Sequence, residues 1–139
     1  MSIKSLAHIC IKTGDLQRTE DFYCGALEMK KLFNFVLRKE VIGFYLKAAN
    51  ETFIEVFQDG AATPGAERTT LHHFCLQTDL LSDLRQRLID RGYAPREIIM
   101  GADHSPQFWV QDPNGLEIEF QEYTDKSAQL TGHDVELLE

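Results

Sequence analysis

The sequence predicts an α+β fold of two consecutive β-α-β-β-β modules that form a curled mixed sheet around a central metal cleft. In each half, one alternating stretch and one amphipathic stretch precede three further strand-like stretches. A segment rich in Gly, Pro and Ala, residues 59–68, separates the halves. His8 and Glu55 lie 47 positions apart, and His73 and Glu119 lie 46 apart. Because one helix covers only one face of four strands, we expect these side chains on a concave inner face.

The first module begins with a strand at residues 6–12, in which polar and apolar side chains alternate. Gly14 ends this strand, and Asp15 can cap a helix that runs through Leu27. Aromatic and β-branched residues predict three more strands, at 31–38, 41–47 and 52–58.

The second module restarts the pattern with a strand at residues 70–78. Leucines at helical spacing predict a helix at 80–91, which ends at Gly92. Three more strands are expected, at 94–99, 107–111 and 116–123. The last two are joined by a strong turn sequence, Asp-Pro-Asn-Gly.

We therefore expect a single domain over residues 1–123, with modules at about 4–58 and 70–123 and a linker at 59–69. Residues 124–139 are polar and acidic and are interpreted as a C-terminal tail or a dimer arm.

Composition excludes several classes of protein. The net charge of −8 argues against nonspecific nucleic-acid binding, which needs a basic face. No apolar run reaches the ~18 residues of a membrane span, and residues 1–12 lack the features of a signal peptide. The three cysteines have no CxxC spacing and are expected to be reduced thiols. We expect a cytoplasmic protein that binds neither nucleic acid nor membrane.

Two imidazoles and two carboxylates are suitable ligands for one divalent metal, which would be Ni, Zn, Co, Mn or Fe. The residues that supply them are His8, Glu55, His73 and Glu119. A lone strand histidine is more often partly buried, and a lone Glu is more often solvated. A matched set of four favours a metal site, because buried carboxylates are costly unless they are paired or metal-bound. His72 is an alternative ligand. We select His73 because a cysteine follows it two positions later, as Cys10 follows His8.

Four segments, in this order and spacing, resemble the vicinal oxygen chelate superfamily, which includes glyoxalase I, bleomycin resistance proteins and extradiol dioxygenases. The segments are His8–Leu32, Glu51–Phe57, His73–Leu81 and Asp112–Phe120. The resemblance covers residues 6–123 and implies paired β-α-β-β-β modules and a homodimer. In the glyoxalase I branch it implies metal binding by His, Glu, His and Glu at the positions of His8, Glu55, His73 and Glu119.

The resemblance also implies an activity, that of a glyoxalase I-like isomerase or lyase. Such an enzyme moves a proton next to a carbonyl of a small vicinal-oxygen substrate, such as a hemithioacetal or an α-hydroxycarbonyl, with the metal acting as a Lewis acid. Glu119 is the first candidate for the general base and Glu55 the second, unless both remain plain ligands. Glutathione use is not implied, because Lys12 replaces an Arg and lacks its bidentate fork.

Four further residues are candidate substrate contacts: His104, Lys12, Gln77 and Trp109. His104 belongs to a loop near the expected site, where polar residues often bind ligands. Trp109 is alternatively core or a wall of the pocket. Cys10 and Cys75 share a strand face with the histidines, but small packing residues are the commoner role.

Two other functions stay open. An Fe(II) extradiol-type dioxygenase uses two His and one Glu, which would leave Glu55 spare, and four protein ligands leave two positions on an octahedral metal. A non-catalytic binding protein would hold a small molecule in the cleft of a dimer, as bleomycin-resistance relatives do, and those often lack the metal ligands. The intact set of four favours the isomerase.

Overall fold

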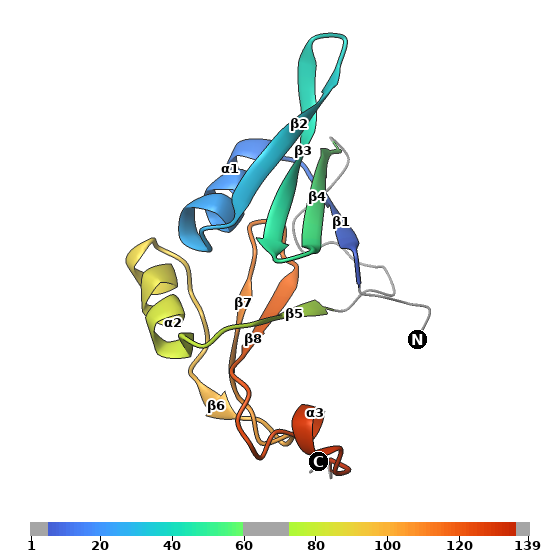
Figure 1. Cartoon of the computed structure of the whole chain (residues 1–139). Coiled ribbons are helices and arrows are strands. Elements are labelled where there is room, and N and C mark those ends of the chain that lie inside the picture. Colours follow the sequence, from blue (N-terminus) through green and yellow to red (C-terminus); the bar gives the residue numbers. More distant parts are fainter. Residues whose placement is uncertain (1–5, 60–72, 136–139) are drawn as a thin grey trace. The chain divides into compact units, whose positions relative to one another are not determined.

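The computed structural model describes residues 6–59 and 73–135, which form two compact units (Figure 1). The first unit contains residues 6–59 together with Pro113–Gly115, and the second contains the remaining residues from His73 onward. Each unit is built on its own four-stranded mixed sheet, which confirms the predicted α+β fold with paired β-α-β-β-β modules. Most of the expected linker lies outside the described residues.

The first unit follows the predicted element order. Its elements are β1 (His8–Thr13), α1 (Leu16–Glu20), η1 (Asp21–Ala26), β2 (Lys30–Leu37), β3 (Glu40–Ala49) and β4 (Thr52–Gln58). The sheet order is β1-β4-β3-β2, with β1 parallel to β4 and the other pairs antiparallel. The Asp15 side chain accepts a hydrogen bond from the Arg18 amide at 3.0 Å, which confirms the predicted helix cap.

The second half of the predicted first helix is a π-helix, η1, and this differs from the α-helix that we expected. The Leu27 amide donates to the Phe22 carbonyl five residues earlier, at 3.0 Å. The wider turn keeps Phe22, Tyr23 and Ala26 fully buried. The helix therefore still supplies the apolar cover for the first sheet.

The two faces of the first sheet have different roles. Strand alternation turns one set of apolar side chains into the core, each 5% exposed or less: Ile11, Phe44, Leu46, Ile54 and Val56. The opposite face carries His8, Cys10 and Lys12 on β1 and Glu55 on β4. The alternating burial of β1 confirms the predicted alternation of this strand and places His8, Cys10 and Lys12 on one face.

The second unit repeats this topology. Its elements are β5 (His73–Gln77), α2 (Leu81–Asp90), β6 (Ile99–Met100), β7 (Pro106–Gln111), β8 (Glu117–Gln121) and α3 (Ala128–Thr131). The sheet order is β5-β8-β7-β6, with β5 parallel to β8. The core side is lined by Leu81, Leu88, Phe108, Val110, Ile118 and Phe120, each 5% exposed or less. The other side of the sheet carries His73, Cys75 and Glu119.

The strand expected at 94–99 is mostly wrong, because only β6 at Ile99–Met100 pairs with β7. Pro95 has no amide hydrogen to donate to a ladder. The Arg96 amide donates to the Trp109 carbonyl of β7 at 2.8 Å, while the Arg96 carbonyl accepts a hydrogen bond from Arg85 Nε at 2.7 Å. The segment before β6 is therefore held by a backbone bond to β7 and by a side-chain bond from α2, without the regular pairing of a strand.

The chain after β8 forms the short helix α3 and packs on the loop before β7. The Ala128 amide donates to the Asp103 carbonyl at 2.9 Å, and Ser105 Oγ donates to Ser127 Oγ at 2.8 Å. Both serines are fully buried. In the described part of the chain, no helix is long and apolar enough to cross a membrane.

Candidate metal centre

In the first unit, β1 and β4 bring His8 and Glu55 together on the face opposite the helix. The strands are parallel, and Cys10 lies opposite Glu55, so that His8 lies diagonally across from the carboxylate. His8 Nε2 is 3.6 Å from Glu55 Oε1, with side-chain exposures of 43% and 22%. The imidazole also meets the ring of Tyr45 edge-on, with 6.0 Å between centroids.

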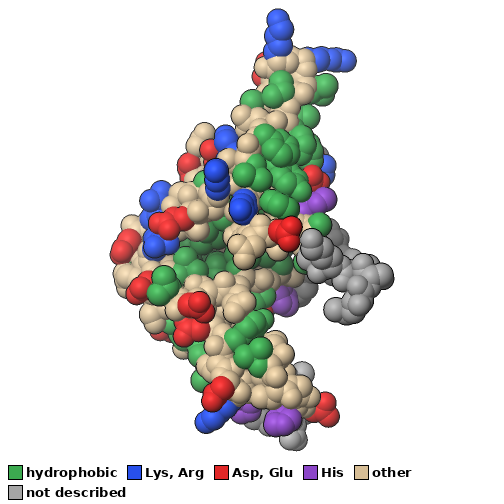
Figure 2. All heavy atoms as spheres, in the orientation of Figure 1, with side chains coloured by type: hydrophobic (Ala, Val, Ile, Leu, Met, Phe, Trp, Pro, Cys, Tyr) green, Lys and Arg blue, Asp and Glu red, His purple; other side chains and the backbone are tan. Residues whose placement is uncertain are grey.

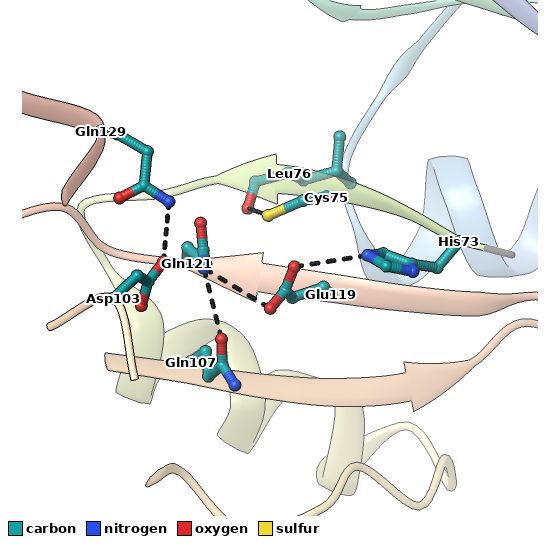
Figure 3. Close-up of polar contacts among 8 residues, drawn as sticks. All are labelled: His73, Cys75, Leu76, Asp103, Gln107, Glu119, Gln121 and Gln129. Carbon is teal, nitrogen blue, oxygen red and sulfur yellow. Dashed lines mark hydrogen bonds and ion pairs between the residues drawn. The ribbon is translucent and has the colours of Figure 1, made fainter. Parts of the chain in front are cut away.

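In the second unit, β5 and β8 bring His73 and Glu119 together at the equivalent register. Cys75 lies opposite Glu119, and His73 Nε2 is 3.7 Å from Glu119 Oε1 (Figure 3). The Glu119 side chain is only 12% exposed and that of His73 is 35% exposed. Trp109 packs against the His73 ring at 4.6 Å between centroids. This contact makes Trp109 a wall beside the pair.

The spacing within each pair is compatible with two ligands of one cation. Separations of 3.6 and 3.7 Å are too long for a good N–H···O bond. Two donors bound at about 2.1 Å to one ion at a tetrahedral angle are roughly 3.4 Å apart. Among the described residues, no group of three or more His, Cys, Asp or Glu is gathered closely enough to hold a metal. Each unit therefore offers two donors of the types that Zn, Ni, Co and Fe accept.

Glu119 lies in an environment that disfavours its charge. Burial raises the pKa of Glu119, the nearby Asp103 adds to the rise, and the Cys75 thiol and His73 offset only part of it. Burial and the charge of Glu119 raise the pKa of Cys75 to about 12. Cys75 is therefore a protonated thiol at neutral pH, and its Sγ donates to the Leu76 carbonyl at 3.8 Å (Figure 3).

Beside Glu119 lies a network of polar side chains, which we call the Gln121 network: Asp103, Gln107, Gln121 and Gln129. Gln121 is 6% exposed, and its Nε2 lies 2.9 Å from Asp103 Oδ2, 3.3 Å from Gln107 Oε1 and 3.5 Å from Glu119 Oε2 (Figure 3). Gln129 Nε2 donates to the same Asp103 oxygen at 2.7 Å.

The Gln121 network keeps Asp103 ionised next to Glu119. Burial alone would raise the pKa of Asp103, but hydrogen bonds from Gln129, the Ser105 amide and Gln121 outweigh it and lower the pKa. The two carboxylates thus have pKa values that move in opposite directions. Neighbouring carboxyl groups that differ in this way suit separate roles as fixed charge and proton acceptor.

Gln121 was not predicted from the sequence as a site residue. It lies two residues after Glu119 on β8, so strand alternation alone places both on one face. An amide side chain, however, is neither a typical metal ligand nor an acid or base. The role of Gln121 depends on its hydrogen bond to Asp103, eighteen residues away in the chain.

The remaining candidate residues occupy distinct places. Lys12 extends its Nζ over the Phe57 ring at 5.3 Å, on the His8 face of the first sheet. Gln77 is exposed at the end of β5, opposite Gln121. His104 is exposed and has a positive φ of 64°, and its carbonyl accepts a bond from Thr124 Oγ1 at 3.2 Å. His72 lies outside the described residues.

Known structures share this architecture. A glyoxalase family protein from Enterococcus faecalis matches with a TM-score of 0.76 at 20% identity, over 88% of this chain and 100% of its own. A lactoylglutathione lyase from Agrobacterium tumefaciens matches with a TM-score of 0.68 at 14% identity, over 88% and 96%. TnmS3, an antibiotic binding protein from Streptomyces sp. CB03234, matches with a TM-score of 0.72 at 19% identity, over 89% and 99%.

At these identities the structural matches establish the fold alone. A comparison with curated proteins finds no significant match. The sequence itself matches the profile of one family over residues 5–120, which is most of the chain. The protein therefore belongs to the Glyoxalase/Bleomycin resistance protein/Dioxygenase superfamily.

Proposed function

We propose that this protein is a metal-dependent glyoxalase-like isomerase or lyase that acts on a small vicinal-oxygen substrate. His8, Glu55, His73 and Glu119 would together bind one divalent metal, either within one chain or across a homodimer. The observation that carries the proposal is the repeated His–Glu pair, at 3.6 and 3.7 Å and at equivalent register in two sheets. Membership of a superfamily that includes glyoxalases supports the class of reaction.

The metal, when bound, supplies Lewis acidity to the oxygens of the substrate. Glu119 would take the proton from the carbon next to the carbonyl, because burial raises the pKa of this carboxyl towards the working pH, where a general base is most effective. The Gln121 amide, whose Nε2 lies 3.5 Å from Glu119 Oε2, would orient the carboxylate. Glu55, which is more exposed, would exchange a proton at the second carbon.

A non-catalytic binding protein is the second candidate, because the first unit exposes aromatic side chains such as Phe33, which is 48% exposed. One structural neighbour, TnmS3, is an antibiotic binding protein. Glu55→Gln separates the two functions. It should abolish most isomerase turnover, whereas the affinity of a sequestered apolar ligand should hardly change.

The test is proton exchange at the α-carbon of hemithioacetals and α-hydroxycarbonyls in D2O, followed by NMR with protein loaded with Ni, Zn, Co, Mn or Fe. We expect exchange with at least one metal and a loss of about 100-fold or more in Glu119→Gln. Glu40→Gln, an exposed acid on β3, is the matched control and should keep full activity. Metal-loaded protein that exchanges no substrate proton would contradict the isomerase.

A further inference from the structure

Five aromatic side chains form a continuous surface, the aromatic platform, on the face of the first sheet that carries His8 and Glu55. Tyr45 lies at its centre and stacks on Phe33 at 4.9 Å and on Phe53 at 5.4 Å between centroids. Phe35 stacks on Phe57 at 4.5 Å and meets Phe33 edge-on at 5.3 Å. Figure 2 shows hydrophobic side chains gathered over β2 to β4. The platform thus spans three strands without interruption.

The aromatic platform is not part of the core. The core side chains of this sheet, such as Phe44, point to the helix side and are almost fully buried. Phe33 is 48% exposed, and the other members of the platform are half-buried. Contiguous exposed apolar surface of this kind marks a binding site more often than a packing need.

The fold itself does not require the platform, as the second sheet shows. The two sheets have the same strand order, and Trp109 occupies the register position of Tyr45, opposite the glutamate. The neighbouring positions on that face of β7 and β8 hold polar residues, Gln107 and Gln121. Since the second unit folds with one ring where the first has five, the additional rings point to a ligand that the first unit recognises.

Lysines border the aromatic platform. Lys12 Nζ lies 5.3 Å from the centroid of Phe57. Lys47 on β3 is exposed. It lies opposite Phe53 of β4 and opposite Lys30 of β2. Glu55 is the one acidic residue that the described strands of this unit place on this face. The border therefore suits a ligand that combines a flat ring with a negative charge.

We propose that the aromatic platform binds the ring of the substrate, and that the substrate is an aryl α-hydroxy acid, whose α-carbon carries the proton that the proposed reaction moves. The ring would pack on the exposed side of the platform at Phe33, which is 48% exposed, and the carboxylate would pair with Lys12 or Lys47. The 6.0 Å between the His8 and Tyr45 rings places the vicinal oxygens of such a molecule beside the His8–Glu55 pair. This assignment rests on the proposed function, because it names the substrate class of the same site.

The first probe is phenylglyoxylate, an analogue that has no proton on its α-carbon and is therefore not turned over. It is compared with cyclohexylglyoxylate, which has the same charge and vicinal oxygens but no flat ring. Calorimetric titration of the full chain should show roughly tenfold or more preference for phenylglyoxylate. Phe33→Leu should reduce that preference to about threefold or less, and the exposed position of Phe33 means that the variant keeps its fold. Leu80→Ala, an exposed apolar residue of the second unit, should leave the preference unchanged. Equal affinity for the two acids would overturn the proposal.

The charge contribution is tested separately. Lys12→Gln should lower the affinity for phenylglyoxylate by about threefold to tenfold and leave the affinity for neutral 1-phenyl-1,2-propanedione unchanged. Lys126→Gln, an exposed lysine of the second unit, is the matched control. Loss of a dimer in Phe33→Leu, with unchanged affinity for phenylglyoxylate, would assign the platform to a second copy of the chain and overturn the proposal.

Failure of this inference and failure of the proposed function give different results, because titrations with and without metal separate them. Aryl preference in a protein that takes up no metal would support the platform and contradict the isomerase. Metal uptake and proton exchange without aryl preference would support the isomerase and contradict the platform.

Discussion

Gln121→Met should destabilise the protein far more than the same change at an exposed glutamine. Met matches the length of Gln but cannot donate to Asp103, which then loses a hydrogen bond of 2.9 Å at a site where Gln121 is 6% exposed. A buried hydrogen bond to a charged group contributes about 1.5–3 kcal/mol. We therefore expect the free energy of unfolding to fall by about 1.5–3 kcal/mol near pH 7.

Gln86→Met is the matched control. Gln86 Nε2 donates to Asp90 Oδ1 at a similar 2.9 Å, but both residues are exposed on α2. Such pairs four residues apart contribute about 0.2–0.5 kcal/mol. The control should therefore lose no more than about 0.5 kcal/mol.

The assay is urea unfolding of wild type and both variants between about pH 3 and 7. The hydrogen bonds hold the pKa of Asp103 below its usual value, so the ion stabilises the fold above the unfolded-state pKa of about 3.9. That stabilisation is lost as the pH falls through the lowered pKa of the folded state. The loss in free energy of unfolding caused by Gln121→Met should therefore be largest near neutral pH and smaller in acid. A deficit that matches Gln86→Met, or that is independent of pH, would refute the reasoning.

Three further predictions concern the same unit. Burial raises the pKa of Glu119, so metal-free protein loses stability as the pH rises above the unfolded-state pKa of about 4.3. In thermal melts, Glu119→Gln should therefore be more stable than wild type near neutral pH and equally stable near the unfolded-state pKa. A less stable Glu119→Gln at neutral pH would contradict the prediction. The pKa of Cys75 is about 12, so its reaction with iodoacetamide near pH 8, followed by peptide mass spectrometry, should be at least roughly tenfold slower than that of an ordinary thiol. The reaction should be faster in Glu119→Gln, and a normal rate in wild type would contradict the raised pKa. His104 has a φ of 64°, so His104→Val should cost about 1–2 kcal/mol more than His104→Gly in urea unfolding, and equal stabilities would contradict the strain.

The sequence predicts most of the fold because alternation and helical spacing are local properties. β4 was predicted with its observed bounds, and the Asp15 cap and the topology of both modules are confirmed. The π-helix η1 was not predicted, because one shift in hydrogen-bond spacing leaves the apolar pattern almost unchanged. α3 was missed because four residues form a helix only with tertiary support, here from the loop at Asp103–Ser105.

The candidate site was predictable to a smaller degree. The repeat identifies His8, Glu55, His73 and Glu119, and the structure shows that each histidine lies beside the glutamate of its own module. Their joint role as ligands of one metal stays a prediction. The Gln121 network and the aromatic platform depend on registers between strands that are distant in sequence, which local patterns do not contain.

Metal stoichiometry tests the central claim most directly. Protein purified without a chelator or an affinity tag should contain about one Ni, Zn, Co, Mn or Fe per site by mass spectrometry. Replacement of His8, Glu55, His73 or Glu119 should each remove most of it, whereas His133→Ala, an exposed histidine after α3, should keep it. Protein that contains no metal and takes up none on addition would contradict the account.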